Sequence, residues 1–167
     1  MLNQALIAEI NHEASSTRKM LERVPQEKFD WKPHEKSMSL GRLATHVAEL
    51  PNWMTRTLTT EEFDFSKHQY KPNIAESQEH LLQIFDTNLQ KALQILENTS
   101  DDSLRAPWTL RNGERVFFTL PRIATLRSMS LNHLIHHRGQ LSVYLRLLNV
   151  PIPGMYGPSA DEMAMFQ

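Results

Sequence analysis

The sequence contains no cysteine, no long apolar run and no large excess of charge of either sign. Without cysteine, the chain can form no disulfide, offer no thiolate to a metal ion and use no cysteine nucleophile of its own. Any thiol chemistry would therefore need a thiol from outside the protein. Because no apolar run approaches the ~20 residues that span a bilayer, we expect no membrane partner.

The N-terminal stretch MLNQALIAEINHEASSTRKM lacks the basic start and the continuous apolar block of a secretory signal, so we expect a cytoplasmic protein. The formal net charge of -1 does not favour nucleic acid as a partner. With 167 residues, of which 40% are hydrophobic, the chain suits one globular domain that covers residues 1–167.

Helical spacing of apolar residues predicts long helices over residues 2–23, 40–58, 77–98 and 122–149. Ser39 can cap the second of these helices. Pro51 interrupts it, because proline lacks an amide hydrogen and crowds the carbonyl of Val47, so we expect a kink or a tightened turn just after His46. Pro121 suits the first turn of the last helix.

The segments between these helices complete the expected fold. Residues 59–75 are typical of a polar connection, and the tail VPIPGMYGPSADE should extend over the surface. The stretch APWTLRNGERVFFTL predicts a hairpin, because Asn112 and Gly113 can both adopt the positive φ of a type I′ turn. We therefore predict an all-α fold, a four-helix bundle with a long crossover connection and a small β-hairpin before the last helix.

Three histidines lie close together in LNHLIHHRGQ, on the last predicted helix. At 100° per residue, His133, His137 and Gln140 share the apolar face, whereas His136 lies toward its edge and Arg138 well outside it. A buried imidazole lowers stability unless its nitrogens have partners. A divalent cation can satisfy two rings one helical turn apart, and hydrogen bonds to carboxylates or carbonyls of other helices are the alternative.

A third ligand must come from another helix, and His46 is the best candidate, because it shares a face with Leu43, Leu50 and Trp53. The site is not that of a zincin protease, because no glutamate follows His133. Imidazole ligands suit zinc, nickel, iron or copper, so ligand type does not choose among these metals.

Three polar residues near these histidines are candidate catalytic residues. Glu49, one turn after His46, can reach the metal or accept a proton, or it is simply solvated. Arg138 can fix a carboxylate or a substrate anion, or it forms an ordinary surface salt bridge. Gln140 can donate to a water at the metal, or it bonds to the backbone.

Three segments resemble the DinB/YfiT-like superfamily, and the resemblance spans nearly the whole chain. They are SMSLGRLATHVAELPNWM, NHLIHHRGQLSVYLRLLNV and VPIPGMYGPSADE. The resemblance implies a four-helix bundle, commonly a homodimer, with a metal held by one histidine of the second helix and two of the fourth. These positions match His46, His133 and His137, and His136 is not expected to be a ligand.

The resemblance also bears on the reaction, since some relatives look like thiol-dependent transferases or isomerases that use bacillithiol, mycothiol or similar cofactors. Three neutral histidines leave coordination positions open, as catalytic sites require. We therefore predict a metal-dependent transferase in which an external low-molecular-weight thiol attacks an electrophilic small-molecule substrate. A metal-dependent hydrolase and a non-enzymatic, stress-linked metal-binding or interaction domain are the alternatives.

Overall fold

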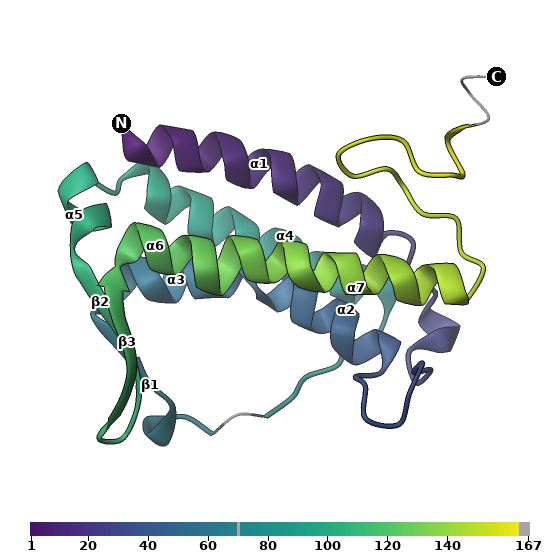
Figure 1. Ribbon diagram of the computed structural model, residues 1–167, viewed down its shortest axis with the longest axis horizontal. Coiled ribbons are helices and arrows are strands. Elements are labelled where there is room, and N and C mark those ends of the chain that lie inside the picture. Colours follow the sequence, from purple (N-terminus) through teal and green to yellow (C-terminus); the bar gives the residue numbers. More distant parts are fainter. Residues whose placement is uncertain (70, 164–167) are drawn as a thin grey trace.

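The computed structural model describes residues 1–69 and 71–163, which form a mostly helical fold with a small three-stranded sheet at one end of the helices (Figure 1). Residue 70, in the predicted polar connection, and residues 164–167, at the end of the predicted domain, lie outside the described residues. The longer helices are α1 (Leu2–Leu21), α2 (Leu40–Glu49), α3 (Pro51–Thr59), α4 (Gln78–Glu97) and α7 (His133–Leu147). The shorter helical segments are η1 (Gln26–Lys28), η2 (Phe65–Lys67), α5 (Asp101–Arg105), α6 (Arg122–Leu126) and η3 (Arg127–Asn132).

The core lies between the long helices. Helix α4 packs against α1, α2 and α3, and α7 packs against α1 and α2. Fully buried side chains at these contacts include Leu43, Val47, Phe85 and Leu141. Each large apolar side chain buried in this way contributes about 1.5–3 kcal/mol. Among the described residues, no helix combines the length and the hydropathy that a bilayer-spanning segment needs.

The second predicted helix is two helices, α2 and α3, with the break at Leu50. Pro51 is the first residue of α3, where its missing amide hydrogen has no helical acceptor to lose. The break therefore lies later than the predicted kink just after His46, and His46 stays inside a regular helix. Ser39 caps α2 as predicted, because its hydroxyl accepts from the Arg42 amide at 3.3 Å.

The last predicted helix consists of α6, η3 and α7 in succession, and η3 is π-helical. A π-helix has more residues per turn than an α-helix, so a wheel drawn at 100° per residue fails across this segment. On α7 the buried side chains are those of Leu134, Arg138, Leu141 and Leu145. The histidines at 133 and 137 lie beside this buried row, half-buried, rather than at its centre.

The predicted hairpin is present as β2 (Pro107–Asn112) and β3 (Arg115–Pro121). Its turn differs from the type I′ prediction, because Gly113 has a positive φ of 58° and Asn112 does not. Pro121 ends β3 and precedes α6 instead of starting the helix. The sequence did not predict β1 (Glu62–Asp64), which pairs parallel with β2 inside the supposed polar connection.

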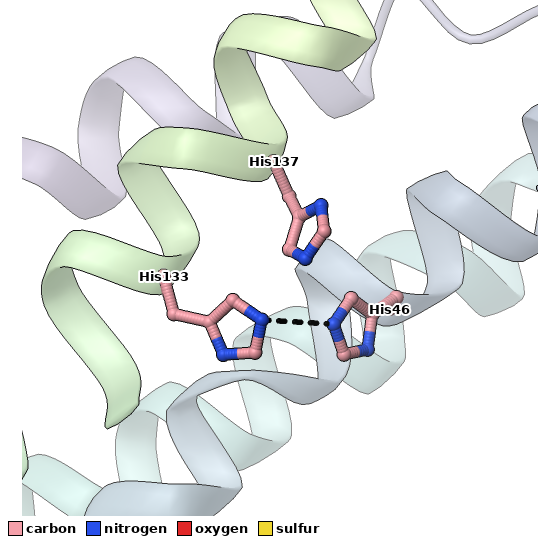
Figure 2. Close-up of side chains that lie close together, drawn as sticks. All are labelled: His46, His133 and His137. Carbon is pink, nitrogen blue, oxygen red and sulfur yellow. Dashed lines mark hydrogen bonds between the residues drawn. The ribbon is translucent and has the colours of Figure 1, made fainter. Parts of the chain in front are cut away.

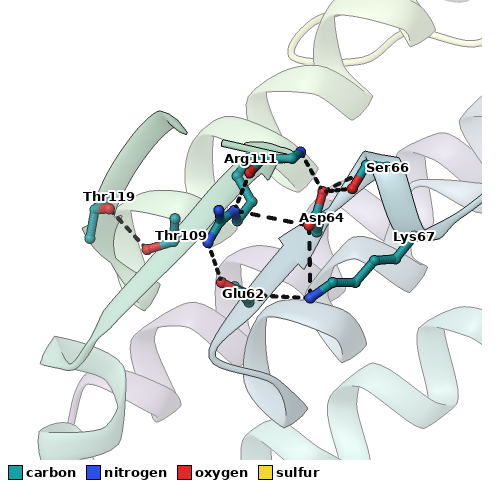
Figure 3. Close-up of polar contacts among 8 residues, drawn as sticks. Glu62, Asp64, Ser66, Lys67, Thr109, Arg111 and Thr119 are labelled. Atoms are coloured by element: carbon teal, nitrogen blue, oxygen red, sulfur yellow. Dashed lines mark hydrogen bonds and ion pairs between the residues drawn. The ribbon is translucent and has the colours of Figure 1, made fainter. Parts of the chain in front are cut away.

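Hydrogen bonds to Asp64 fasten β1 to the hairpin turn (Figure 3). One carboxylate oxygen of Asp64 accepts from the Gly113 amide at 2.9 Å, the Ser66 amide at 3.0 Å and the Ser66 hydroxyl at 2.7 Å. These bonds, that from Gly113 foremost, lower the pKa of Asp64 to about 2. The aromatic residues on either side of Asp64, Phe63 and Phe65, are thereby placed next to α3.

Candidate metal centre

The structure brings His46, on α2, together with His133 and His137, at the start of α7. One ring nitrogen of each lies within 4.8 Å of the other two, and the Nε2 atoms of His46 and His133 are 3.4 Å apart. Figure 2 shows the rings turned toward one another from two different helices. The ring centroid of His46 lies 5.1 Å from that of His133 and 4.6 Å from that of His137.

A hydrogen bond on the outer side of the cluster orients one of the rings. The Nδ1 atom of His137 lies 2.7 Å from Oε1 of Gln140. When one ring nitrogen donates its proton to an oxygen, the other keeps a free lone pair. Histidines that bind metals are held by the same kind of outer partner.

The electrostatic environment keeps all three imidazoles neutral. Burial, followed by the nearby rings and the Arg42 guanidinium, lowers the pKa of His46 to about 4. Burial also lowers the pKa of His133 and that of His137. All three side chains are therefore in the unprotonated form that a metal ligand requires near neutral pH.

The donor set fits a divalent transition metal ion, and so does the spacing of one pair of its nitrogens. Two nitrogens bound to one zinc ion at ~2.0–2.1 Å and at tetrahedral angles are about 3.3 Å apart. The observed 3.4 Å between His46 and His133 matches this value, and it is long for a direct hydrogen bond between them. Three nitrogen ligands also leave a coordination position open, as in catalytic zinc sites.

Glu49 lies near the cluster without joining it. Its carboxylate pairs with Arg42 at 3.2 Å, and both side chains line the same cavity as His46. Within the part of the chain that the structure describes, the close group of possible metal-binding atoms consists of the three histidines and does not include Glu49. The predicted proton-acceptor role of Glu49 stays a prediction.

Gln140 was predicted to face inward, and this was wrong, because the residue is exposed on the outer side of α7. Its amide oxygen bonds to His137 rather than to the backbone. The error comes from the position of the buried row on α7, which runs through Leu134, Leu141 and Leu145 and not through the histidines. His136 is exposed on the same helix, and its ring lies 4.9 Å from that of His137.

The predicted position of Arg138 outside the apolar face was also wrong, because 2% of its side chain is exposed. Its guanidinium pairs with the buried Glu13 at 2.7 Å and donates to the Thr17 hydroxyl at 3.0 Å. It also donates to the hydroxyl of Tyr156 at 2.9 Å, which ties the C-terminal segment to α7. Arg138 is thus a buried structural residue, and neither a substrate contact nor a surface salt bridge.

A cavity of about 420 Å³ opens beside His46, between α2, α3 and the segment that follows β1. Its walls include Trp53, Arg56 and Phe63. Sequence reasoning missed this cavity, since residues 59–75 show no periodicity that would place them against a helix. The ring stack of His68 on Phe63, with centroids 4.5 Å apart, was equally invisible in the sequence.

Comparison with known proteins agrees with the resemblance seen in the sequence. The model of the DinB family matches residues 1–167. The chain belongs to the DinB family. This DinB family chain is 28% identical over 158 residues to the protein YrdA of Bacillus subtilis (strain 168), a match that covers 92% of the chain and 87% of YrdA.

Solved structures of DinB-like proteins share the fold of this family member. A DinB-like protein from Bacillus cereus ATCC 10987 superposes with a TM-score of 0.70 at 21% identity, over 92% of this chain and 97% of that one. The DinB-like protein YjoA of Bacillus subtilis gives a TM-score of 0.67 at 19% identity, over 89% and 96% of the two chains. The predicted DinB-like fold is therefore confirmed.

Proposed function

We propose that this protein binds a divalent metal ion, such as zinc, nickel or iron, through His46, His133 and His137. The observation that carries the proposal is the convergence of three neutral imidazoles whose nitrogens lie within 4.8 Å of one another. Without a cation, the facing Nε2 atoms of His46 and His133 form at best one long hydrogen bond. A metal ion satisfies all three rings at once.

Elemental analysis of the purified protein, after loading with zinc and removal of excess metal, tests this proposal. We expect about one zinc per chain, and a loss of bound zinc in the His46→Ala, His133→Ala and His137→Ala variants. The matched control is His136→Ala, which changes an exposed histidine of the same helix turn and should retain its zinc. Unchanged zinc in all three ligand variants would contradict the proposal.

We infer further that the site serves a transfer reaction in which an external low-molecular-weight thiol attacks an electrophilic small molecule. A carbon–sulfur bond forms, and the bond from the same carbon to an anionic leaving group breaks. When bound, the metal supplies Lewis-acid activation of the nucleophile. The cavity beside His46 has room for a small substrate, and the chain has no cysteine to act as the nucleophile itself. In this proposal the proton that the thiol loses goes to Glu49, which lines the same cavity and pairs with Arg42.

The reaction class is tested with zinc-loaded protein, free cysteine as the thiol and 1-chloro-2,4-dinitrobenzene as the electrophile. The expected result is a thiol-dependent rate that disappears in the His133→Ala variant. A parallel assay follows hydrolysis of 4-nitrophenyl acetate without thiol. Hydrolysis in this assay, with no thiol-dependent reaction in the first, would identify a metal-dependent hydrolase instead of a transferase. If the bound metal exchanges no ligand with azide or thiol, both enzyme functions are excluded and the protein is a non-enzymatic metal-binding domain.

We also propose that the helical part is a four-helix bundle and that the protein forms a homodimer in the cytoplasm. In Figure 1, α1, α4, the α2–α3 pair and the α6–α7 pair run along the same long direction, which supports the bundle. The exposed apolar side chains Val143 and Leu147, on the outer side of α7, support a second copy as partner. Sedimentation equilibrium tests the dimer, and a monomer mass at high protein concentration would contradict it.

A further inference from the structure

The cavity beside His46 carries an excess of positive charge on its walls. One carboxylate, that of Glu49, is among the lining residues, and Arg42 pairs with it. The cations among the described lining residues are Arg42, Arg56, Lys67 and Lys71. Lys67 pairs with Glu62 at 3.5 Å and with Asp64 at 3.8 Å, so the excess of positive charge comes from Arg56 and Lys71. Such an imbalance attracts an anionic ligand and disfavours a cationic one.

Arg56 is the cation with the most defined surroundings. Its guanidinium carbon lies 4.8 Å from the ring centroid of Phe63 and 5.7 Å from that of Trp53. Within the described residues, the guanidinium forms no ion pair and no hydrogen bond. A half-buried guanidinium that lies on aromatic rings keeps its N–H donors at its edge, in the fork geometry that matches a carboxylate.

The aromatic side chains of the same cavity offer an apolar surface. The rings of Trp53 and Phe63 meet edge to face at 5.2 Å, and those of Phe63 and Phe65 do so at 5.1 Å. A cavity of about 420 Å³ is near the lower end of the range in which small organic ligands bind. The ligand that fits these walls is therefore small, with one anionic group and an apolar or aromatic body.

We propose that Arg56 is a specificity-determining residue that binds the carboxylate of a small organic acid, whose apolar body packs against Trp53 and Phe63. The inference deepens the proposed function and rests on it, because His46 belongs both to this cavity and to the histidine cluster. A substrate held at its carboxylate by Arg56 is retained in the cavity that His46 shares with the proposed metal site.

Isothermal titration calorimetry with two matched probes, 3-phenylpropanoate and the neutral 3-phenylpropanamide, tests the role of Arg56. Both are titrated into metal-free and zinc-loaded protein. We expect the wild type to bind the carboxylate about tenfold more tightly than the amide, and Arg56→Gln to lose this preference while binding the amide unchanged. The control Arg105→Gln removes the same charge from an exposed site on α5 and should keep the preference.

Three outcomes would overturn the inference. They are equal affinity of the wild type for the two probes, no binding of either probe up to about 10 mM, and a preference that survives in Arg56→Gln. If Arg56→Gln keeps the preference for the carboxylate only when it is loaded with zinc, the carboxylate binds the metal instead of Arg56. Zinc content is measured in the same samples. Loss of the carboxylate preference in metal-free Arg56→Gln supports the inference even if the protein binds no zinc and the proposed metal site is wrong.

Discussion

Arg138 on α7 and Glu13 on α1 form an ion pair of 2.7 Å in which both side chains are buried. The guanidinium also donates to the Glu13 carbonyl and to the Thr17 hydroxyl, each at 3.0 Å. Because Arg138 directly follows His137, this pair fixes α7 against α1 at the level of the histidine cluster. The geometry of the proposed metal site therefore depends on a contact outside it.

Removal of Arg138 should destabilise the protein strongly, because it leaves the Glu13 carboxylate buried without a counter-ion. We expect Arg138→Met to lower the free energy of unfolding by about 3–5 kcal/mol, measured by urea denaturation. The double variant with Glu13→Leu should recover most of this loss, since no unpaired charge remains. The control Arg105→Met breaks an exposed pair and should cost under about 1 kcal/mol. Similar losses in the two single variants would contradict the prediction.

Gln140 should strengthen metal binding by holding His137 in one orientation. Its Oε1 atom lies 2.7 Å from Nδ1 of His137, so Gln140→Leu leaves that ring free to rotate. We expect zinc affinity to fall about tenfold without loss of the site, measured by competition with a chelating dye. Ser142→Ala is the matched control, because that hydroxyl bonds to the Gly139 carbonyl of the same helix and not to a histidine. Unchanged affinity in Gln140→Leu would show that the bond has no role in ligation.

Local patterns were sufficient where neighbours in sequence decide the structure. Helix α4 begins and ends within a residue of the prediction, because the Ser77 hydroxyl accepts from the His80 amide and caps its start. The three histidines lie together as predicted, because α7 packs on α2, although His133 and His137 lie beside the buried row of α7 and not within it.

Local patterns failed where a distant partner decides the structure. The wheel angle from His133 placed Arg138 outside the apolar face, and the acceptors that allow Arg138 to be buried lie 121 and 125 positions away on α1. Strand β1 has three residues, too few for an alternation of polar and apolar side chains to identify it. It is held by pairing with β2 and by the bond from the Gly113 amide to Asp64. The cavity beside His46 was missed for the same reason, because β1 places one of its walls.

Stability of the metal-free protein should fall as the pH drops from about 6.5 toward about 4. The pKa of His46 is lowered from 6.5 to about 4, so in this window the unfolded chain takes up a proton that the folded chain does not. The contribution of His46 to the free energy of unfolding is therefore complete above the pKa that this residue has in the unfolded chain, and it declines below that pKa. The lowered pKa values of His133 and His137 change the stability in the same direction. Urea midpoints at about pH 7 and about pH 5 should show a smaller decline for His46→Gln than for the wild type. Equal declines would rule out titration of His46 as a cause.

Asp64→Ala should loosen β1 and, with it, the aromatic wall of the cavity. The substitution removes the acceptor of the Gly113 amide at 2.9 Å and of the Ser66 amide at 3.0 Å, so hydrogen exchange at both amides should become faster. Asp64→Asn keeps a carbonyl oxygen at this position and should show a smaller change. Since Phe63 and Phe65 flank Asp64 and line the cavity, Asp64→Ala should also weaken binding of 3-phenylpropanoate while zinc content stays the same. Unchanged exchange at Gly113 would mean that pairing with β2 alone holds β1, and a loss of zinc would mean that the sheet supports the histidine cluster as well.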